Sequence, residues 1–429
     1  MYDFSRQIKK ALRSPIFVLT MSVAVGHLIS LAVLSVSTRV LPVELFGEVA
    51  VISSCAVFMT PIACLRIEQK LLLVPEWDVR RIILNALSTG FKFLAGLWLL
   101  IWAIQICFFD DYIFGGVIQS IVVTVVCFAS IPYQIFVSLI QRTQKLNQLA
   151  KITLLRIVSQ QLTIIAFIFF GDKSLALLAA EFVFFALPAV LATLNIKKAF
   201  AGKSSDKSLI FKGVQPPDLI KQDLLSTAIN SLNGALPLFM VGVYLGAEQA
   251  GYFAIASRFA HLPIGTIGRA TAHKFTADFS ALKRNQQQSK MKKRFFQSLA
   301  ALIISALALY GVGFVFYDEL ITFVVGDGWQ KTSSIFAVIL PWVFIKFIFS
   351  PVSSIFLILS QTQLKLFVDC GMSLLLASLL FFCYLFDTSE DGFYLYLSIA
   401  NGSAYLVLIA FSFVSLQRHL RHRQKGASE

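Results

Sequence analysis

SLALLAAEFVFFALPAVLATLN, residues 174–195, holds a single charged side chain in a run long enough to cross a bilayer as an α-helix. A helix rises about 1.5 Å per residue and the hydrocarbon core is roughly 30 Å thick, so about 20 apolar residues are enough. About twelve such stretches follow one another, and we expect a helix in each. They cover residues 15–38, 46–65, 82–109, 113–140, 152–170, 174–195, 223–245, 250–272, 295–317, 333–359, 366–386 and 393–416. The sequence therefore predicts an all-α integral membrane protein.

The composition of the chain agrees with this fold class. Hydrophobic residues make up 57% of the sequence and charged residues only 14%, and the mean hydropathy is +0.77. A soluble domain of this composition would expose large apolar patches to water. The first thirteen residues are polar and basic, and no small-residue cleavage site follows before Arg39. We therefore expect a retained first helix instead of a signal peptide.

The positive charge of the chain is distributed unevenly between its connections. Most of the 37 Lys and Arg residues fall at the two termini and in every second connection. Only Arg39, Lys173 and Lys331 lie in the other connections, which are rich in Asp and Glu. The positive-inside rule then places both termini in the cytoplasm. The net charge of +14 reflects this topology and attraction to anionic membrane lipids, so we expect no nucleic acid partner.

The longest strongly polar connection divides the predicted helices six and six. We expect an N-terminal six-helix lobe over 1–195, a cytoplasmic linker over 196–222, a C-terminal six-helix lobe over 223–417 and a basic cytoplasmic tail over 418–429. A short internal sequence repeat supports the division; the alternative is that the same residues recur by chance. Its residues are Leu41, Glu44, Gly47 and Ala50, which recur as Leu245, Glu248, Gly251 and Ala254. Parallel repeats of this kind place a transport site at their interface.

Several charged side chains fall inside the predicted spans. They are the cations Lys92, Arg156, Arg258, Arg269 and Lys346 and the acids Glu181 and Asp369. A cation at the centre of a membrane helix costs roughly 2.5 to 3.5 kcal/mol, so such residues should avoid lipid. Arg156, Arg269 and Asp369 lie near cytoplasmic helix ends and can reach the interface. Lys92, Arg258 and Lys346 lie deeper and are better candidates for function.

Polar side chains follow one face of two neighbouring predicted helices. Arg258, His261 and Arg269 are spaced at i, i+3 and i+11 on the eighth helix, and Asn230 and Asn233 share a face of the seventh. We expect a wet cavity between these helices. A guanidinium group binds phosphate or carboxylate with two parallel hydrogen bonds, which favours an anionic substrate. For each of these residues, hydrogen bonding between helices is the alternative.

Four further residues complete the predicted site. His27 lies on the first helix, with Arg39 at its external end. Glu181 and Asp369 are candidates for coupling to a proton or sodium gradient or to the membrane potential, with structural ion pairs as the alternative. We find no pattern of a nucleotide site, a catalytic residue or paired metal ligands, so we expect no cofactor and no enzyme activity.

The order of motifs resembles a known family. RVLPVELFGE at residues 39–48, followed by LRIE at 65–68, resembles the N-terminal signature of the polysaccharide-export, or Wzx-type, flippases. These belong to the multidrug/oligosaccharidyl-lipid/polysaccharide (MOP) exporters. LGAEQAGY at residues 245–252 resembles the signature of their second lobe. The resemblance implies a V-shaped, MATE-like pair of six-helix lobes with a cavity lined by helices one, two, seven and eight.

The resemblance also implies a substrate and a place. The substrate is an oligosaccharide on polyprenyl pyrophosphate, such as an O-antigen unit of lipopolysaccharide, turned from the cytoplasmic to the outer leaflet of the bacterial inner membrane. Arg258 and Arg269 fall where the cavity would hold the pyrophosphate. Lys92 and Lys346 would add positive charge, and the aligned His and Asn side chains would contact phosphate or sugar.

Three other functions are alternatives to the transport of a lipid-linked oligosaccharide. A cation-coupled drug exporter of the same superfamily should favour carboxylates in its cavity, whereas the deep charges here are mostly cations. A membrane glycan polymerase or ligase should carry a large external loop, whereas the external connections are short. A scaffold that gathers glycan polymerases and other assembly proteins needs no charged residues inside the membrane, whereas this chain has several.

Overall fold

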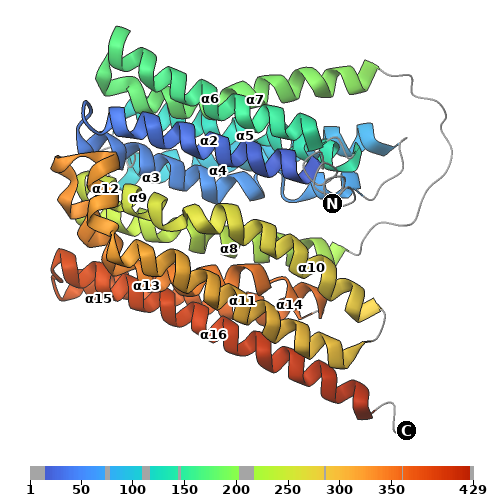
Figure 1. Ribbon diagram of the computed structural model, residues 1–429. Coiled ribbons are helices and arrows are strands. Elements are labelled where there is room, and N and C mark those ends of the chain that lie inside the picture. Colours follow the sequence, from blue (N-terminus) through green and yellow to red (C-terminus); the bar gives the residue numbers. More distant parts are fainter. Residues whose placement is uncertain are drawn as a thin grey trace, which may run out of the picture. The chain divides into compact units, whose positions relative to one another are not determined.

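The computed structural model describes residues 15–72, 78–108, 116–143, 146–201, 217–284, 287–359 and 361–425. Throughout these ranges the regular structure is helical and contains no strand, which confirms the predicted all-α class (Figure 1). The chain divides into two compact units, Met1–Ala235 and Leu236–Glu429, with the boundary inside one long helix. We describe each unit separately.

The first unit consists of long helices joined by short 3-10 segments. The helices are α2 (Pro15–Ser37), α3 (Val43–Met59), α4 (Val79–Phe108), α5 (Val117–Thr143), α6 (Leu146–Phe170), α7 (Ala176–Ala201) and the first part of α8 (Pro217–Leu245). Helix α7 packs against both α5 and α6, and α6 also packs against α2 (Figure 1). Between α3 and α4 the chain forms two 3-10 segments, η1 (Thr60–Ile62) and η2 (Ile67–Leu72), which pack on α5.

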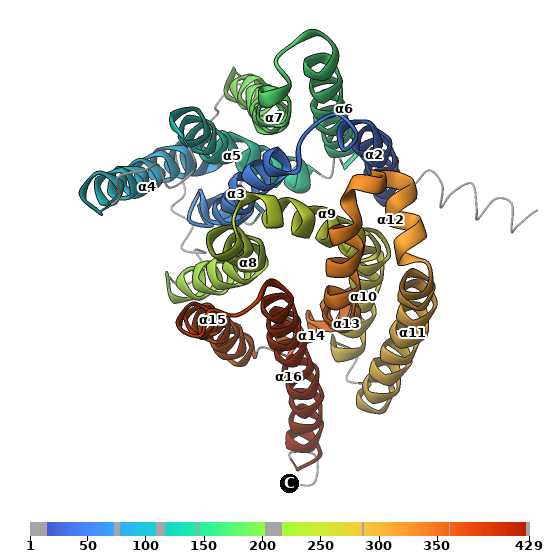
Figure 2. The same ribbon diagram turned by 90° about the vertical axis from the view of Figure 1, so that its left-hand side faces the viewer.

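The second unit begins in the last part of α8 and is built around α13. Its elements are α9 (Ala247–Pro263), the π-helix η5 (Ile264–Gly268), α10 (Arg269–Arg284), α11 (Gln288–Val315), α12 (Tyr317–Val325), η6 (Asp327–Trp329), α13 (Gln330–Val352), α14 (Ile355–Ile358), α15 (Thr362–Leu385) and α16 (Glu390–Lys425). Helix α13 packs against α9, α10, α11 and α16, so it is the central helix of this unit (Figure 2).

The helices have the length and surface of membrane spans. Ten of them within the described ranges are long and apolar enough to cross a bilayer, and Met21–Ser37 adds a shorter apolar segment. Large apolar side chains lie on the outside, among them Phe170 at 92% exposure and Phe323 at 83%. Water would penalise such a surface, whereas lipid does not. The chain is a multi-pass membrane protein.

Among the predicted spans that differ from the observed helices, two are interrupted beside a proline. The span predicted over 250–272 is α9, a π-helical turn and α10, and it continues to Arg284. Proline cannot donate a helical hydrogen bond, so Pro263 interrupts the regular pattern. The span predicted over 333–359 ends at Val352, just after Pro351, and a break precedes the short α14.

The predicted linker is partly helical. Helix α7 continues to Ala201, and α8 begins with Pro217, a residue favoured at the first position of a helix. The rest of the linker, 202–216, lies outside the described residues, as do the basic N-terminal residues 1–14 and tail residues 426–429. Helix α16 extends through most of the predicted tail. The division into two six-helix lobes stays a prediction.

The turn between α3 and α4 has an unusual backbone. Leu65 and Arg66 both have positive φ angles, of 48° and 60°, a conformation that L-residues rarely adopt. The turn is fixed on both sides: the Cys64 thiol contacts the carbonyl of Ile131 on α5 at 3.6 Å, and α4 approaches so closely that only glycine fits at position 90. The LRIE motif therefore lies in a constrained turn of the first unit.

Candidate functional site: a cationic cluster on α9 and α13

Two of the predicted site residues meet inside the second unit. Nζ of Lys346 on α13 lies 3.1 Å from Nε2 of His261 on α9, which is hydrogen-bond distance. Both side chains are half-buried. The contact exists because α9 and α13 pack directly against each other. The two candidates, 85 positions apart in the sequence, therefore form one group.

The second ring nitrogen of His261 determines how this contact works. Nδ1 lies 2.8 Å from the backbone carbonyl oxygen of Ser257, one helical turn earlier. A carbonyl oxygen only accepts hydrogen bonds, so Nδ1 carries the proton. In a neutral imidazole Nε2 is then an acceptor, which suits an ammonium donor. In this arrangement the Lys346–His261 pair carries one positive charge, which is on the Lys346 ammonium group.

Two aromatic rings flank the ammonium group. Nζ of Lys346 lies 5.8 Å from the ring centres of both Trp342, one turn earlier on α13, and Tyr405 on α16. The Trp342 ring also meets the His261 ring edge-on, with 6.0 Å between centres. A cation over an aromatic face gains about 0.5 to 2 kcal/mol, more where water is excluded. These rings stabilise a cation in the span without cancelling its charge, as a carboxylate would.

The backbone next to the cluster is irregular. His261 lies two residues before Pro263, and the π-helix Ile264–Gly268 follows directly. Single π-helical turns occur often at functional sites. The Tyr310 hydroxyl on α11 donates to the carbonyl of Ala260 at 3.1 Å and so holds the end of α9 in place. The end of α9 that leads into the irregular segment is thus anchored one residue before His261.

The predicted basic stripe on the eighth span is only partly present. Arg258 is exposed and lies one turn before His261, on the same face of α9. Arg269 begins α10, beyond the π-helical turn, and its side chain lies outside the described part of the chain. A π turn contains more residues than an α turn, so a spacing of i+11 does not keep one face across it. The place of Arg269 in the site stays a prediction.

The remaining predicted binding residues lie in the first unit. They are Asn230 and Asn233 on α8, Lys92 on α4, His27 on α2 and Arg39 just after α2. Asn233 is buried, His27 is half-buried, and the other three are exposed. The Arg39 guanidinium donates to the backbone carbonyl of Ser35, so this residue also caps the end of its own helix.

The two candidate coupling acids have different surroundings. Glu181 on α7 is buried and accepts hydrogen bonds from Ser53 on α3 at 2.6 Å and from Gln160 on α6 at 3.1 Å. It therefore connects three helices of the first unit. Asp369 on α15 forms an ion pair with Lys365, one turn earlier on the same helix. That short-range pair fits a structural role for Asp369.

Sequence reasoning missed several members of these clusters. Trp342 is spaced four residues before Lys346 on a predicted helix, so its contact was readable from the sequence. Tyr405 comes from another helix, and no sequence signal indicates it. Arg156, expected to reach the cytoplasmic interface, instead stacks between two rings of neighbouring helices. They are Tyr133 at 5.3 Å and Phe184 at 4.1 Å from the guanidinium carbon.

Comparison with known proteins agrees with this architecture. A family model described as "Polysaccharide biosynthesis protein" matches residues 33–334, more than half of the chain. Comparison with curated proteins gives no significant match. A multidrug resistance MATE family transporter of the MOP superfamily, in its inward-facing conformation, is 14% identical with a TM-score of 0.62, over 95% of this chain and 99% of that chain.

A second solved structure is similar to the same extent. It is a MOP superfamily transporter from Pyrococcus furiosus, for which a binding pocket of reverse polarity is said to suggest a different function. It is 13% identical with a TM-score of 0.60, over 94% of each chain. A MATE structure in complex with MaL6 is 12% identical with a TM-score of 0.59, over 95% of this chain and 97% of that chain. At these identities the likeness establishes the fold.

Proposed function

This chain belongs to the family of polysaccharide biosynthesis proteins, and from that premise we propose that it moves a lipid-linked oligosaccharide across the membrane. The substrate we propose is an oligosaccharide on polyprenyl pyrophosphate, a surface polysaccharide unit such as that of O-antigen. The protein would turn it from the cytoplasmic to the outer leaflet of the bacterial inner membrane by alternating access. The fold, shared with MOP superfamily transporters, supports a transporter over an enzyme.

The observation that carries this proposal is the charged pair on α9 and α13. The Lys346–His261 pair carries one positive charge inside the membrane span, flanked by the rings of Trp342 and Tyr405. Arg258 lies one turn away on the same helix face. The pyrophosphate of a lipid carrier is an anion that must leave water to cross the bilayer. Charge-assisted hydrogen bonds from these groups would replace part of its hydration.

The same charge argues against a cationic drug as substrate. A cation entering the cluster would meet Lys346 and Arg258 and would be repelled. The reverse-polarity pocket described for the Pyrococcus furiosus transporter indicates that the MOP fold can also carry a site of other polarity. We therefore rank a cation-coupled drug exporter second.

Energy coupling belongs to the proposal as well. Glu181 accepts hydrogen bonds from two other helices of its unit, so a bound proton would change how α3, α6 and α7 are connected. We propose Glu181 as the site at which a proton gradient acts on the protein. Within the described part of the chain no group of three or more His, Cys, Asp or Glu could hold a metal ion.

Depletion of the protein in its native host tests this function. The radiolabelled polyprenyl-linked intermediate would be extracted before and after treatment of the outer face with a glycosidase. We expect a glycosidase-protected intermediate to accumulate on the cytoplasmic leaflet. An accessible intermediate would place the block after translocation and favour a polymerase or ligase. Unchanged levels of intermediate, with loss of resistance to cationic drugs, would favour the drug exporter.

A further inference from the structure

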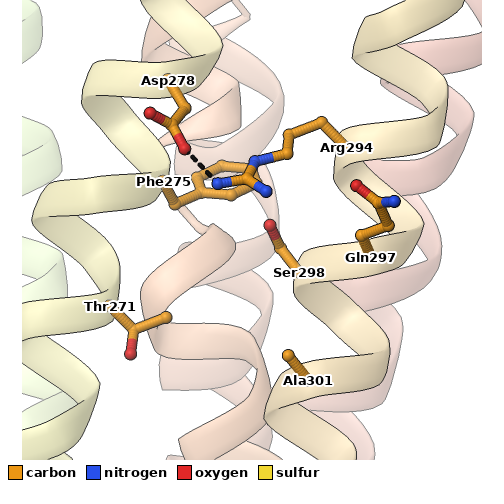
Figure 3. A pocket seen from close by; sticks show the side chains of 7 residues that line it. All are labelled: Thr271, Phe275, Asp278, Arg294, Gln297, Ser298 and Ala301. Carbon is orange, nitrogen blue, oxygen red and sulfur yellow. Dashed lines mark hydrogen bonds and ion pairs between the residues drawn. The ribbon is translucent and has the colours of Figure 1, made fainter.

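A second group of residues lines a pocket between α10 and α11, and this lining shares no residue with the cationic cluster on α9 and α13. The pocket has a volume of about 370 Å³, and its lining is shown in Figure 3. The lining residues are Thr271, Phe275, Asp278, Arg294, Gln297, Ser298 and Ala301. Asp278 and Arg294 form an ion pair across the pocket, and their side chains are 38% and 37% exposed. These two charges are therefore open to a ligand.

The pocket has a charged end and an uncharged end. Helix α10 ends at Arg284 and α11 begins at Gln288, so the ion pair lies toward the connection between them. Thr271 and Ala301 lie two turns farther along their helices, which is about 10 Å at the helical rise. In Figure 3 the ion pair occupies one end and these two residues the other, with Ser298 and Gln297 between.

The polarity of the pocket follows the depth of the membrane. The connection between α10 and α11 belongs to the basic, cytoplasmic side predicted by the positive-inside rule, with Lys290, Lys292 and Lys293 at the start of α11. The ion pair therefore lies nearest the headgroup layer. The Gln297 amide and the Ser298 hydroxyl lie at the next depth, and Thr271 and Ala301 lie deepest in the membrane. A phospholipid has the same order of headgroup, ester and acyl chain.

We propose that this pocket binds the headgroup of a zwitterionic aminophospholipid, with its phosphate at Arg294 and its ammonium group at Asp278. A guanidinium fork matches a phosphate, and a carboxylate accepts from an ammonium group. Binding then exchanges one ion pair for two and leaves neither charge unpaired. A purely anionic headgroup would satisfy Arg294 but be repelled by Asp278 at the same place.

The size of the pocket is consistent with a headgroup. Small-molecule sites commonly measure roughly 300 to 1,000 Å³, so this one is at the low end. It is too small to enclose an oligosaccharide on its carrier. Its volume therefore fits a lipid headgroup and does not fit the whole transported substrate.

Lipid retention by the whole protein tests the proposal. The full chain would be purified in detergent, stripped of lipid and titrated with phosphatidylethanolamine or phosphatidylglycerol of identical acyl chains, with bound lipid counted by native mass spectrometry. We expect phosphatidylethanolamine to bind about tenfold more tightly, the effect of one charged hydrogen bond. Asp278→Asn should remove this preference by weakening phosphatidylethanolamine alone. Arg294→Gln should weaken both lipids.

Two further variants keep the test decisive. Ala301→Trp fills the uncharged end, two helical turns from the ion pair, and should lower retention of phosphatidylethanolamine about tenfold because the larger side chain occupies space needed by the lipid. Glu390→Gln breaks the exposed Lys331–Glu390 pair, which lies outside the pocket, and should leave lipid binding unchanged. Equal or tighter binding of phosphatidylglycerol to the unmodified protein would overturn the proposal. Wild-type retention by Ala301→Trp would also overturn it.

Discussion

The ammonium nitrogen of Lys346 lies 3.1 Å from Nε2 of His261, and the same ring is bound through Nδ1 to the backbone of Ser257. The cation on α13 is thus linked through one side chain to the main chain of α9. The linked turn ends two residues before Pro263, and the π-helix Ile264–Gly268 follows that proline. An anion that draws Lys346 away from His261 would release this link beside an irregular part of the helix.

The hydrogen bond between His261 and Lys346 can be measured through stability. His261→Phe removes the acceptor and leaves a half-buried cation with fewer partners, so we expect a loss of about 1 to 3 kcal/mol. His261→Gln keeps a side-chain oxygen that can accept and should lose less. In a double-mutant cycle with Lys346→Met, the two losses should not add. Thermal unfolding in detergent measures these differences, and additive losses would contradict a direct bond.

Lys346→Met should reduce translocation by about ten- to a hundredfold, because one charged hydrogen bond to the substrate is lost. The matched control is Lys331→Met, which removes an exposed cation on the side of the membrane predicted to be external. The rate of appearance of lipid-linked oligosaccharide on the outer leaflet measures both. Equal rates for the two variants would show that the cation inside the span has no special role.

Much of the fold was readable from apolar stretches alone. The helix predicted over 15–38 is observed as Pro15–Ser37, and the family resemblance read from residues 39–48 is confirmed by the match over 33–334. Hydropathy failed where a helix leaves the apolar layer. Helix α10 is too polar to register as a span, yet its backbone continues the helix to Arg284. A hydropathy window detects burial in lipid and does not detect backbone hydrogen bonding.

Gly90 should be intolerant of a methyl group. A Cβ atom there would lie 2.8 Å from the backbone oxygen of Ala63, which cannot move as a flexible side chain could. Gly96 lies on the same helix and has no neighbour within 4 Å. Helix propensity favours Ala over Gly by roughly 0.5 to 1 kcal/mol, so Gly96→Ala should be neutral or stabilising. Gly90→Ala should instead destabilise by about 1 to 3 kcal/mol.

The melting temperatures of these two variants in detergent check this prediction. Similar values would mean that α4 does not approach the turn after α3 as closely as described.

Glu181→Gln should uncouple translocation from a proton gradient. A gradient of about one pH unit supplies about 1.4 kcal/mol per proton, a factor of about ten in accumulation. That factor should disappear in the variant, whereas exchange of substrate without a gradient should persist. Glu319→Gln, an exposed acid on α12, is the control and should keep the full response. A normal response of Glu181→Gln to the gradient would contradict the proposed coupling.

The candidate site was predicted less completely than the fold. His261 and Lys346 were both expected to be functional, but their pairing depends on how α9 packs on α13, which periodicity cannot give. Tyr405 is contributed by a third helix for the same reason. The expected face joining Arg258 to Arg269 assumed an uninterrupted α-helix, and the π turn changes that register. Pro263 was visible in the sequence, but the π geometry after it was not.

Reconstitution of the purified protein into liposomes with a radiolabelled polyprenyl-pyrophosphate oligosaccharide tests the proposed function most directly. A glycosidase added outside would report how much of the substrate reaches the outer leaflet over time. We expect the accessible fraction to rise from about half, the value for a substrate placed randomly in both leaflets, toward all of it, with Lys346→Met much slower than Lys331→Met. An accessible fraction that stays at its starting value in protein-containing liposomes, as in empty ones, would contradict translocation of this lipid.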